Sequence, residues 1–216
     1  MKALLELRQE SIEHFRKTEA FHRLMSGTLR QQIYIRYLVN VYHYAQHSPK
    51  VIALASSRCV GTHPELAAYL LRHAAEEIGH EQWAYSDLRR LGLFDQQIQS
   101  SRPGTACASM IGLEYYVAGF WNPVALFGWL FTLEAFGADL ATLIGQKLDA
   151  SLNLGGTATY FLAGHGSVDR DHIKDIVEAI DKHIKSPADF DDMLHIARVS
   201  RQLYLGMLQE VVLEND

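Results

Sequence analysis

The stretch from Leu66 to Leu91 repeats a pattern that constrains the fold of the whole chain. Its apolar residues recur at steps of three and four, and such steps return to the same face of an α-helix. We find no run of alternating apolar and polar residues, which would indicate strands, and only five prolines in 216 residues. The sequence therefore predicts an all-α protein.

Seven long helices account for most of the chain in this prediction. Thr62 can cap a helix whose first turn contains Pro64, and Pro49 is expected to kink or break the second helix. Ser186 and Pro187 mark the start of the last one. Helices of this length suit a bundle rather than a solenoid. The predicted helices are residues 2–25, 30–58, 62–92, a segment between "SSRPG" and 122, 123–149, 157–184, and 186 to almost the end.

Size and composition limit the class of protein. We expect residues 1–216 to form a single domain, because 48% of the residues are hydrophobic and no linker-like run divides them. The net charge of −5 argues against a nucleic-acid partner. The two cysteines, Cys59 and Cys107, form no disulfide framework, and the early charges of "MKALLELRQE" do not fit a signal peptide. We therefore expect a cytoplasmic protein.

One apolar segment, "MIGLEYYVAGFWNPVALFGWLF", imitates a membrane span. Glu114 and the central Asn122-Pro123 pair interrupt it, and proline ends one helix and begins the next. We interpret the segment as two short buried helices and expect no membrane partner.

The middle of the third predicted helix carries ionisable residues where apolar ones belong. His73, Glu77 and His80 fall on the same stripe as Leu70 and Leu88. Burying a lone carboxylate costs several kcal/mol, so a buried charge needs a partner. The question is what the partner of this group would be.

Two further predicted helices repeat the feature. Glu134 is the one charge on an otherwise apolar stripe of the fifth helix. In the sixth helix, "HGSVDRDH" places His165, Asp169 and His172 at i, i+4 and i+7, as "HAAEEIGH" does with His73, Glu77 and His80. Glycines at 164 and 166 weaken this as a helix interior.

These groups together would make a ligand set of imidazoles and carboxylates without a thiolate. Such a set suits iron or manganese, and zinc less well. Di-iron sites in bundle cores use Glu-x-x-His motifs of the kind that Glu77 and His80 form. The alternative is that the histidines are core residues paired with acids, or that the faces are assigned wrongly.

The residues resemble the haem-oxygenase-like di-iron oxidase and oxygenase family over roughly residues 15–182. The similar segments are "SGTL", "YHYAQHSPKVIALASSRC", "EEIGHEQWAYSDLRRLG", "NPVALFGWLFTLEAFG" and "YFLAGHGSVDRDH". The resemblance implies a haem-oxygenase-like bundle, here of about seven helices. It implies metal ligands at Glu77, His80, Glu134, His165, Asp169 and His172.

Some assignments within the resemblance stay open. The spacing on the third helix varies in the family, so Glu76 could replace Glu77. Some members add a carboxylate from the second helix, where this sequence offers only His43 and His47. We treat His47 and His73 as possible additional ligands or neighbours of the ligands.

The resemblance implies a non-haem iron-dependent oxidoreductase. We expect two iron ions, O2 as co-substrate, Glu134 as the bridging catalytic carboxylate, and a small organic metabolite as substrate. We also expect a homodimer or higher homo-oligomer. The alternative is a TenA-like or haem-oxygenase-like protein without a di-iron site. Such a protein would be a cofactor-free oxidase, a haem binder or a regulator without activity.

Overall fold

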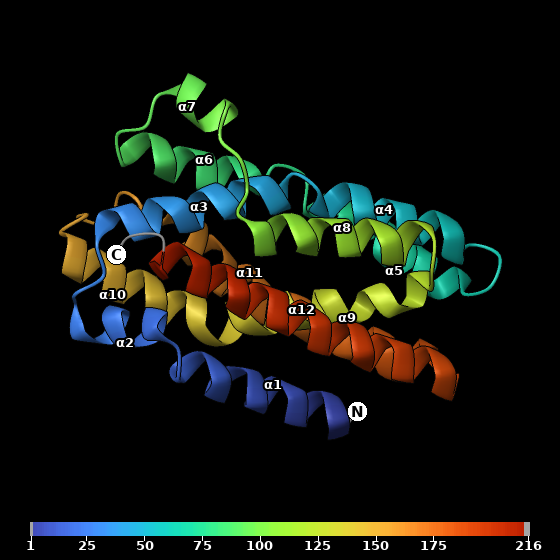
Figure 1. Ribbon diagram of the computed structural model, residues 1–216. Coiled ribbons are helices and arrows are strands. Elements are labelled where there is room, and N and C mark those ends of the chain that lie inside the picture. The colour runs from blue at the N-terminus through green and yellow to red at the C-terminus, as the bar shows by residue number, and fades with distance from the viewer. Residues whose placement is uncertain (1, 214–216) are drawn as a thin grey trace.

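Helices make up all the regular secondary structure of residues 2–213, which are the part of the chain that the computed structural model describes, apart from the side chains of residues 167 and 168. The all-α prediction is confirmed. The elements, of which Figure 1 labels the α-helices, are α1 (Lys2–Arg16), α2 (Glu19–Ser26), α3 (Gln31–Ala45), α4 (Ser48–Cys59), α5 (Pro64–Glu76), α6 (Glu81–Arg90), α7 (Asp95–Gln99), α8 (Thr105–Gly119), the 3-10 turn η1 (Pro123–Ala125), α9 (Leu126–Phe136), the π-helical turn η2 (Gly137–Ala141), α10 (Thr142–Leu152), α11 (Tyr160–His183) and α12 (Pro187–Leu213).

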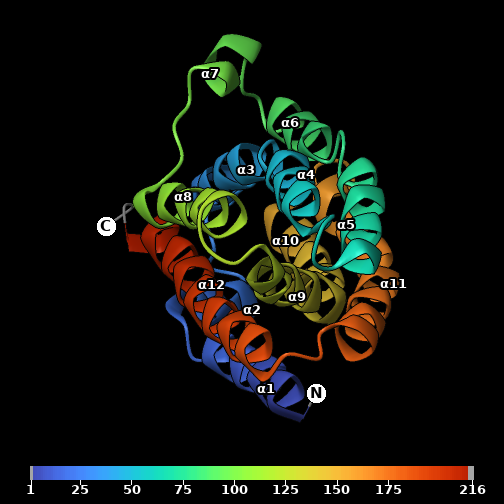
Figure 2. The same cartoon turned by 90° about the vertical axis from the view of Figure 1, so that its right-hand side faces the viewer.

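The apolar helix α9 lies at the centre of the bundle. Figure 2 shows α4, α5, α8, α11 and α12 around it, with α1 below α12 and the short α7 standing apart. The stretch Pro123–Leu152 is long and apolar enough to cross a membrane, but 78% of its most apolar window is buried within the protein. Burial of this kind is what a core helix requires, and it agrees with the interpretation of this region as buried helix.

The prediction of seven helices is wrong, because several of the predicted helices are divided. The first ends at Arg16, and the Thr18 side chain accepts a hydrogen bond from the Phe21 amide (3.2 Å) to begin α2. The second breaks at residues 46–47, so that Pro49 lies in the first turn of α4, where its missing amide costs nothing. The last two predicted helices, by contrast, correspond to α11 and α12.

The third predicted helix is divided where its ionisable residues lie. α5 ends at Glu76 and α6 begins at Glu81, and Gly79 in between has a φ of +95°. A left-handed residue ends an α-helix. Glu77 and His80 therefore lie in a turn, and the continuous helical face predicted for His73, Glu77 and His80 does not exist.

The fifth predicted helix contains the π-helical turn η2 directly after α9. Asp139 in this turn accepts two hydrogen bonds from the Arg8 guanidinium of α1, at 2.7 and 2.6 Å. π-Turns widen a helix locally and occur frequently at functional sites. Here the turn lies between α9, which carries Glu134, and α10.

The glycines of α11 permit close packing rather than ending the helix. A Cβ at Gly164 would lie 2.8 Å from the Trp83 ring, and one at Gly166 would collide with Thr142. Both oxygens of the buried Asp87 carboxylate accept amides from the first turn of α11, at 3.0 and 2.9 Å. α11 can therefore begin at Tyr160 and lie close against α6 and α10.

Gly128 brings α9 against α12. A Cβ added there would collide with the Met193 carbonyl oxygen and lie 2.7 Å from the Ala197 nitrogen, and backbone atoms cannot move aside as a flexible side chain can. We expect Gly128→Ala to lower the free energy of unfolding by about 1–3 kcal/mol or more. Gly112→Ala on α8 is the control: its Cβ meets nothing within 4 Å. It should stabilise the protein by about 0.5–1 kcal/mol, as measured by denaturant unfolding.

Glu114 on α8 is 1% exposed, and neither of its side-chain oxygens has a hydrogen-bond partner. Burial raises its pKa well above the ordinary value of 4.5. Between pH 4.5 and the raised pKa, Glu114 is ionised in the unfolded chain but protonated in the folded chain. The free energy of unfolding therefore falls as the pH rises through this range. In metal-free protein, Glu114→Leu should remove this dependence. Its advantage over the parent should grow by about 1.4 kcal/mol per pH unit in that window. Glu6→Leu, at a side chain 60% exposed, should leave the slope unchanged.

Candidate metal centre

Three parts of the chain converge beside the central helix. The turn between α5 and α6 carries Glu77 and His80, α9 carries Glu134, and α11 carries His165, Asp169 and His172. All of these residues are buried except His165, which is partly buried. The structure thus brings together all six residues that the family resemblance singles out, together with His73 from α5.

One half of the centre is formed by His73, Glu77, Glu134 and His172. Their potential ligand atoms all lie within 4.8 Å of one another. Glu134 Oε1 lies 3.4 Å from His73 Nε2 and 3.3 Å from His172 Nδ1. Metal bonds of about 2.0–2.2 Å allow ligand atoms to be up to about 4.4 Å apart. Movements of a few tenths of an ångström would therefore let one ion contact all four.

The other half is formed by His80, His165 and Asp169, and Glu77 connects the two. Glu77 Oε1 lies 3.3 Å from His80 Nδ1, and His165 Nδ1 lies 3.5 Å from Asp169 Oδ1. The His80 and His165 rings meet edge to face at 4.9 Å. This half therefore offers two imidazoles and one carboxylate beside a carboxylate of the first half.

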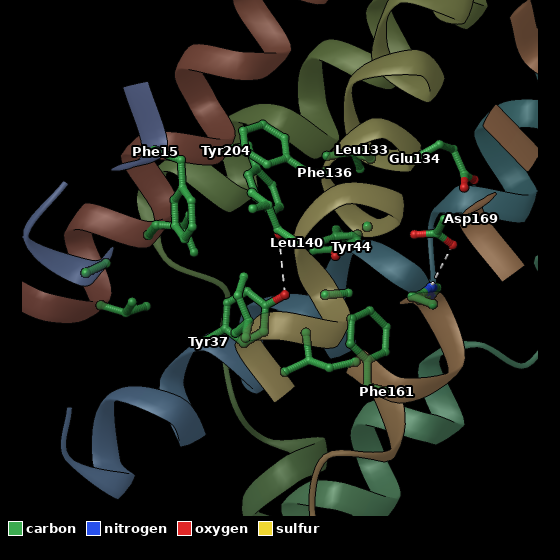
Figure 3. A pocket seen from close by; sticks show the side chains of 18 of the residues that line it. Phe15, Tyr37, Tyr44, Leu133, Glu134, Phe136, Leu140, Phe161, Asp169 and Tyr204 are labelled. Atoms are coloured by element: carbon green, nitrogen blue, oxygen red, sulfur yellow. Dashed lines mark hydrogen bonds and ion pairs between the residues drawn. The ribbon is translucent and has the colours of Figure 1, made fainter. Parts of the chain in front are cut away.

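Asp169 reaches this position because residue 137 has no side chain. A Cβ at Gly137 would collide with the Asp169 carboxylate. Gly137 is the first residue of the π-turn, one turn after Glu134. Figure 3 shows the Glu134 and Asp169 carboxylates facing each other across the end of a cavity. The π-turn and its glycine thus allow carboxylates from α9 and α11 to approach.

The three carboxylates cannot all be charged without compensation. Burial raises the pKa of Asp169, and the nearby Glu134 and Glu77 raise it further. Burial alone would also raise the pKa of Glu134, but the hydrogen bond with His172 and the nearby His73 imidazole outweigh it and lower this pKa. In the metal-free protein one carboxyl group therefore keeps a proton, which a cation would replace.

The histidines are suited to the same role. Burial lowers the pKa of His165 to about 4, and the neighbouring His80 and His172 add to the effect. His165 is therefore a neutral imidazole at physiological pH, the form that binds metals. The buried atoms His73 Nε2, His80 Nδ1, His165 Nε2 and Glu134 Oε2 have no hydrogen-bond partner. Four such atoms in one place are costly unless a ligand binds them, and together with the mixed nitrogen and oxygen donors they fit an iron ion.

His47 is not brought to the centre. Its Nδ1 lies 3.0 Å from the Tyr115 hydroxyl, and the two rings meet edge to face. The second predicted helix instead contributes Tyr44 and Ser48 to the cavity wall. One neighbour of the centre was not singled out from the sequence: the Trp83 ring, which stacks on His80 at 4.2 Å. The turn at Gly79, which the helical pattern concealed, lies between α5 and the helix that carries Trp83. Glu76, the sequence's alternative to Glu77, lies 3.5 Å from His172 Nε2.

A cavity of about 130 Å³ extends from the centre toward α2, α3 and α12. Glu77, Glu134, His165 and Asp169 line its inner end, and apolar side chains such as Leu24 and Leu208 line most of the rest. The Tyr37 and Tyr204 hydroxyls, 3.4 Å apart, are among the few polar groups in it (Figure 3). Its volume is close to that of cavities of ~150 Å³ that hold a benzene molecule.

Comparison with solved structures shows the fold. A domain of unknown function with a haem oxygenase-like fold from Shewanella denitrificans superimposes with a TM-score of 0.88 at 24% identity, covering 98% of this chain and 92% of that one. A TenA homologue from P. horikoshii gives 0.77 at 16% identity, with 96% and 95% covered. Haem oxygenase-1 from the cyanobacterium Synechocystis, solved in complex with haem, gives 0.74 at 16% identity, with 98% and 92% covered.

Comparison of sequences identifies the family. None of the functionally curated proteins matches the chain. A model of a family described as iron-containing redox enzymes matches residues 35–205, which include every residue of the centre. The chain therefore belongs to this family of iron-containing redox enzymes and has the haem-oxygenase-like fold.

Proposed function

We propose that the protein is a non-haem di-iron oxidoreductase that uses O2 to oxidise a small organic metabolite. The observation that carries the proposal is the group of buried, unpartnered imidazole and carboxylate atoms at the meeting point of α5, α9 and α11. A protein without a metal would gain nothing from leaving such atoms unsatisfied. Family membership supports iron as the ion.

The two halves of the centre would hold one iron each. His73, Glu134 and His172 would hold the first, and His80, His165 and Asp169 the second. Glu134, whose Oε2 has no other partner, is the proposed bridging carboxylate, and Glu77 lies close enough to both halves to be shared. Bound iron would supply the one-electron chemistry that O2 activation needs.

The chain itself would position the substrate and exclude water. The cavity meets the centre at Glu77, Glu134, His165 and Asp169, so a bound molecule would lie against these four side chains. Neither lysine nor arginine lines the cavity. We therefore propose a substrate whose body is apolar and whose polar group faces the centre. The two cysteines are buried and free, and on this ground we also propose a cytoplasmic location.

Gly137→Ala tests the role of the π-turn. The added Cβ would displace the Asp169 carboxylate, so we expect the bound iron to fall from two ions per chain to about one after anaerobic loading. Gly145→Ala on α10 is the matched control, because its Cβ would lie 3.4 Å from Leu162 and far less crowded. Thermal unfolding monitored by circular dichroism checks that both variants fold. Two irons in a folded Gly137→Ala variant would contradict the assignment of Asp169.

His172→Ala and His47→Ala separate the proposed ligands from a histidine that the structure places elsewhere. We expect His172→Ala to bind iron at least ~10-fold more weakly and to lose the reaction of the ferrous protein with O2, since even a residue that supports a ligand is worth about 10–100-fold. His47→Ala should retain both properties. Metal analysis and an oxygen electrode provide the measurements. A His172→Ala variant that behaves like the parent would refute the di-iron proposal, as would a parent that binds haem through histidine and no ferrous iron.

A further inference from the structure

A second opening reaches the centre through a different set of residues. It is a cleft of about 320 Å³ between α5 and α11, and none of the residues lining the apolar cavity lines it. His73, Glu76 and His172 are its residues nearest the centre. The cavity thus reaches Glu77, Glu134, His165 and Asp169, and the cleft reaches His73 and His172.

The cleft is polar, and acids outnumber bases along it. Glu65, Glu76, Asp175 and Glu178 line it, against Arg72 and Lys182. All six side chains are exposed. Carboxylates concentrated in a groove raise the local concentration of cations and their rate of entry.

Two buried imidazoles at the floor of the cleft can receive a cation that these acids attract. His73 is 2% exposed, and its Nε2 has no hydrogen-bond partner. Glu76 connects the floor to the surface: its Oε2 lies 3.5 Å from His172 Nε2 and 3.8 Å from His73 Nδ1, while 57% of the side chain is exposed. A cation bound at Glu76 would therefore lie next to two buried imidazoles.

We infer that the cleft between α5 and α11 is the entry site for the metal ion, in which Glu76 receives a divalent cation from solvent and passes it to His73 and His172. This inference rests on the proposed function, because it supplies the same centre. It assigns a separate task to each opening: the polar cleft admits the ion, and the apolar cavity receives the organic substrate.

The rate of ferrous iron uptake tests the inference. The protein carries its own reporter, since Trp83 stacks on His80 and lies 5.2 Å from His165, so iron binding should quench its fluorescence. Metal-free protein is mixed anaerobically with Fe²⁺ in a stopped-flow instrument at about 0.1 M salt, where charges more than ~10 Å away are largely screened. Bound iron is measured at equilibrium in parallel.

Three variants are compared with the parent. Asp175→Asn/Glu178→Gln removes two acids from the cleft and should slow uptake about threefold or more, and Lys182→Gln should accelerate it. Asp171→Asn/Asp181→Asn removes two acids from α11 that do not line the cleft, and should leave the rate nearly unchanged. Equilibrium iron content should be the same in all four proteins. Opposite effects of the acidic and basic substitutions would not arise from a general loss of packing.

Equal uptake rates in the parent and Asp175→Asn/Glu178→Gln would overturn the inference while leaving the proposed function intact. The same holds if the α11 control slows uptake as much, or if the cleft variant loses equilibrium iron, because the acids would then act on affinity rather than entry. A parent that takes up no ferrous iron would refute the proposed function, and the inference with it.

Discussion

The burial of three carboxylates at one point is the constraint on which the rest of the structure depends. Glu77, Glu134 and Asp169 come from three separate elements, and each would repel the others at neutral pH if no cation lay among them. The surrounding imidazoles and one retained proton reduce this cost in the metal-free protein. The rest of this cost is offset by the packing of the apolar central helix against its neighbours, which holds the charged groups in place.

The same constraint explains the irregular features near the centre. The α5–α6 turn moves Glu77 and His80 off a helical surface and into the interior, and the π-turn opens α9 where Asp169 must enter. The glycines of α11 then allow that helix to approach α6 and α10 closely. Irregular backbone at these points is the geometric condition for collecting ligands from helices that would otherwise pack through apolar side chains.

The sequence predicted the composition of the centre better than its geometry. The three-and-four periodicity showed which sides of the chain face inward, and so it pointed to Glu134 and to the α11 triplet. It could not show that the third predicted helix stops at Glu76, because "EEIGH" satisfies a helical pattern equally well and one glycine decides the outcome. The break near Pro49 was predictable because proline lacks an amide, whereas the π-turn has no composition of its own. His47 satisfied a stripe on the predicted second helix, but it lies in the break between α3 and α4, beside Tyr115.

The π-turn also makes chain length, rather than residue type, a property of the centre. A π-turn encloses one residue more than an α-turn, so loss of any single residue from Gly137–Ala141 would restore a regular α-helix. The helix beyond this segment would keep nearly the same face, because the extra residue of a π-turn is taken up within one wider turn. The change would be confined to the stretch beside Asp169, where the wider turn and Gly137 leave room for its carboxylate, although every ligand would still be encoded. Among relatives, a one-residue gap in this segment would mark chains that keep the ligands but not the wider turn.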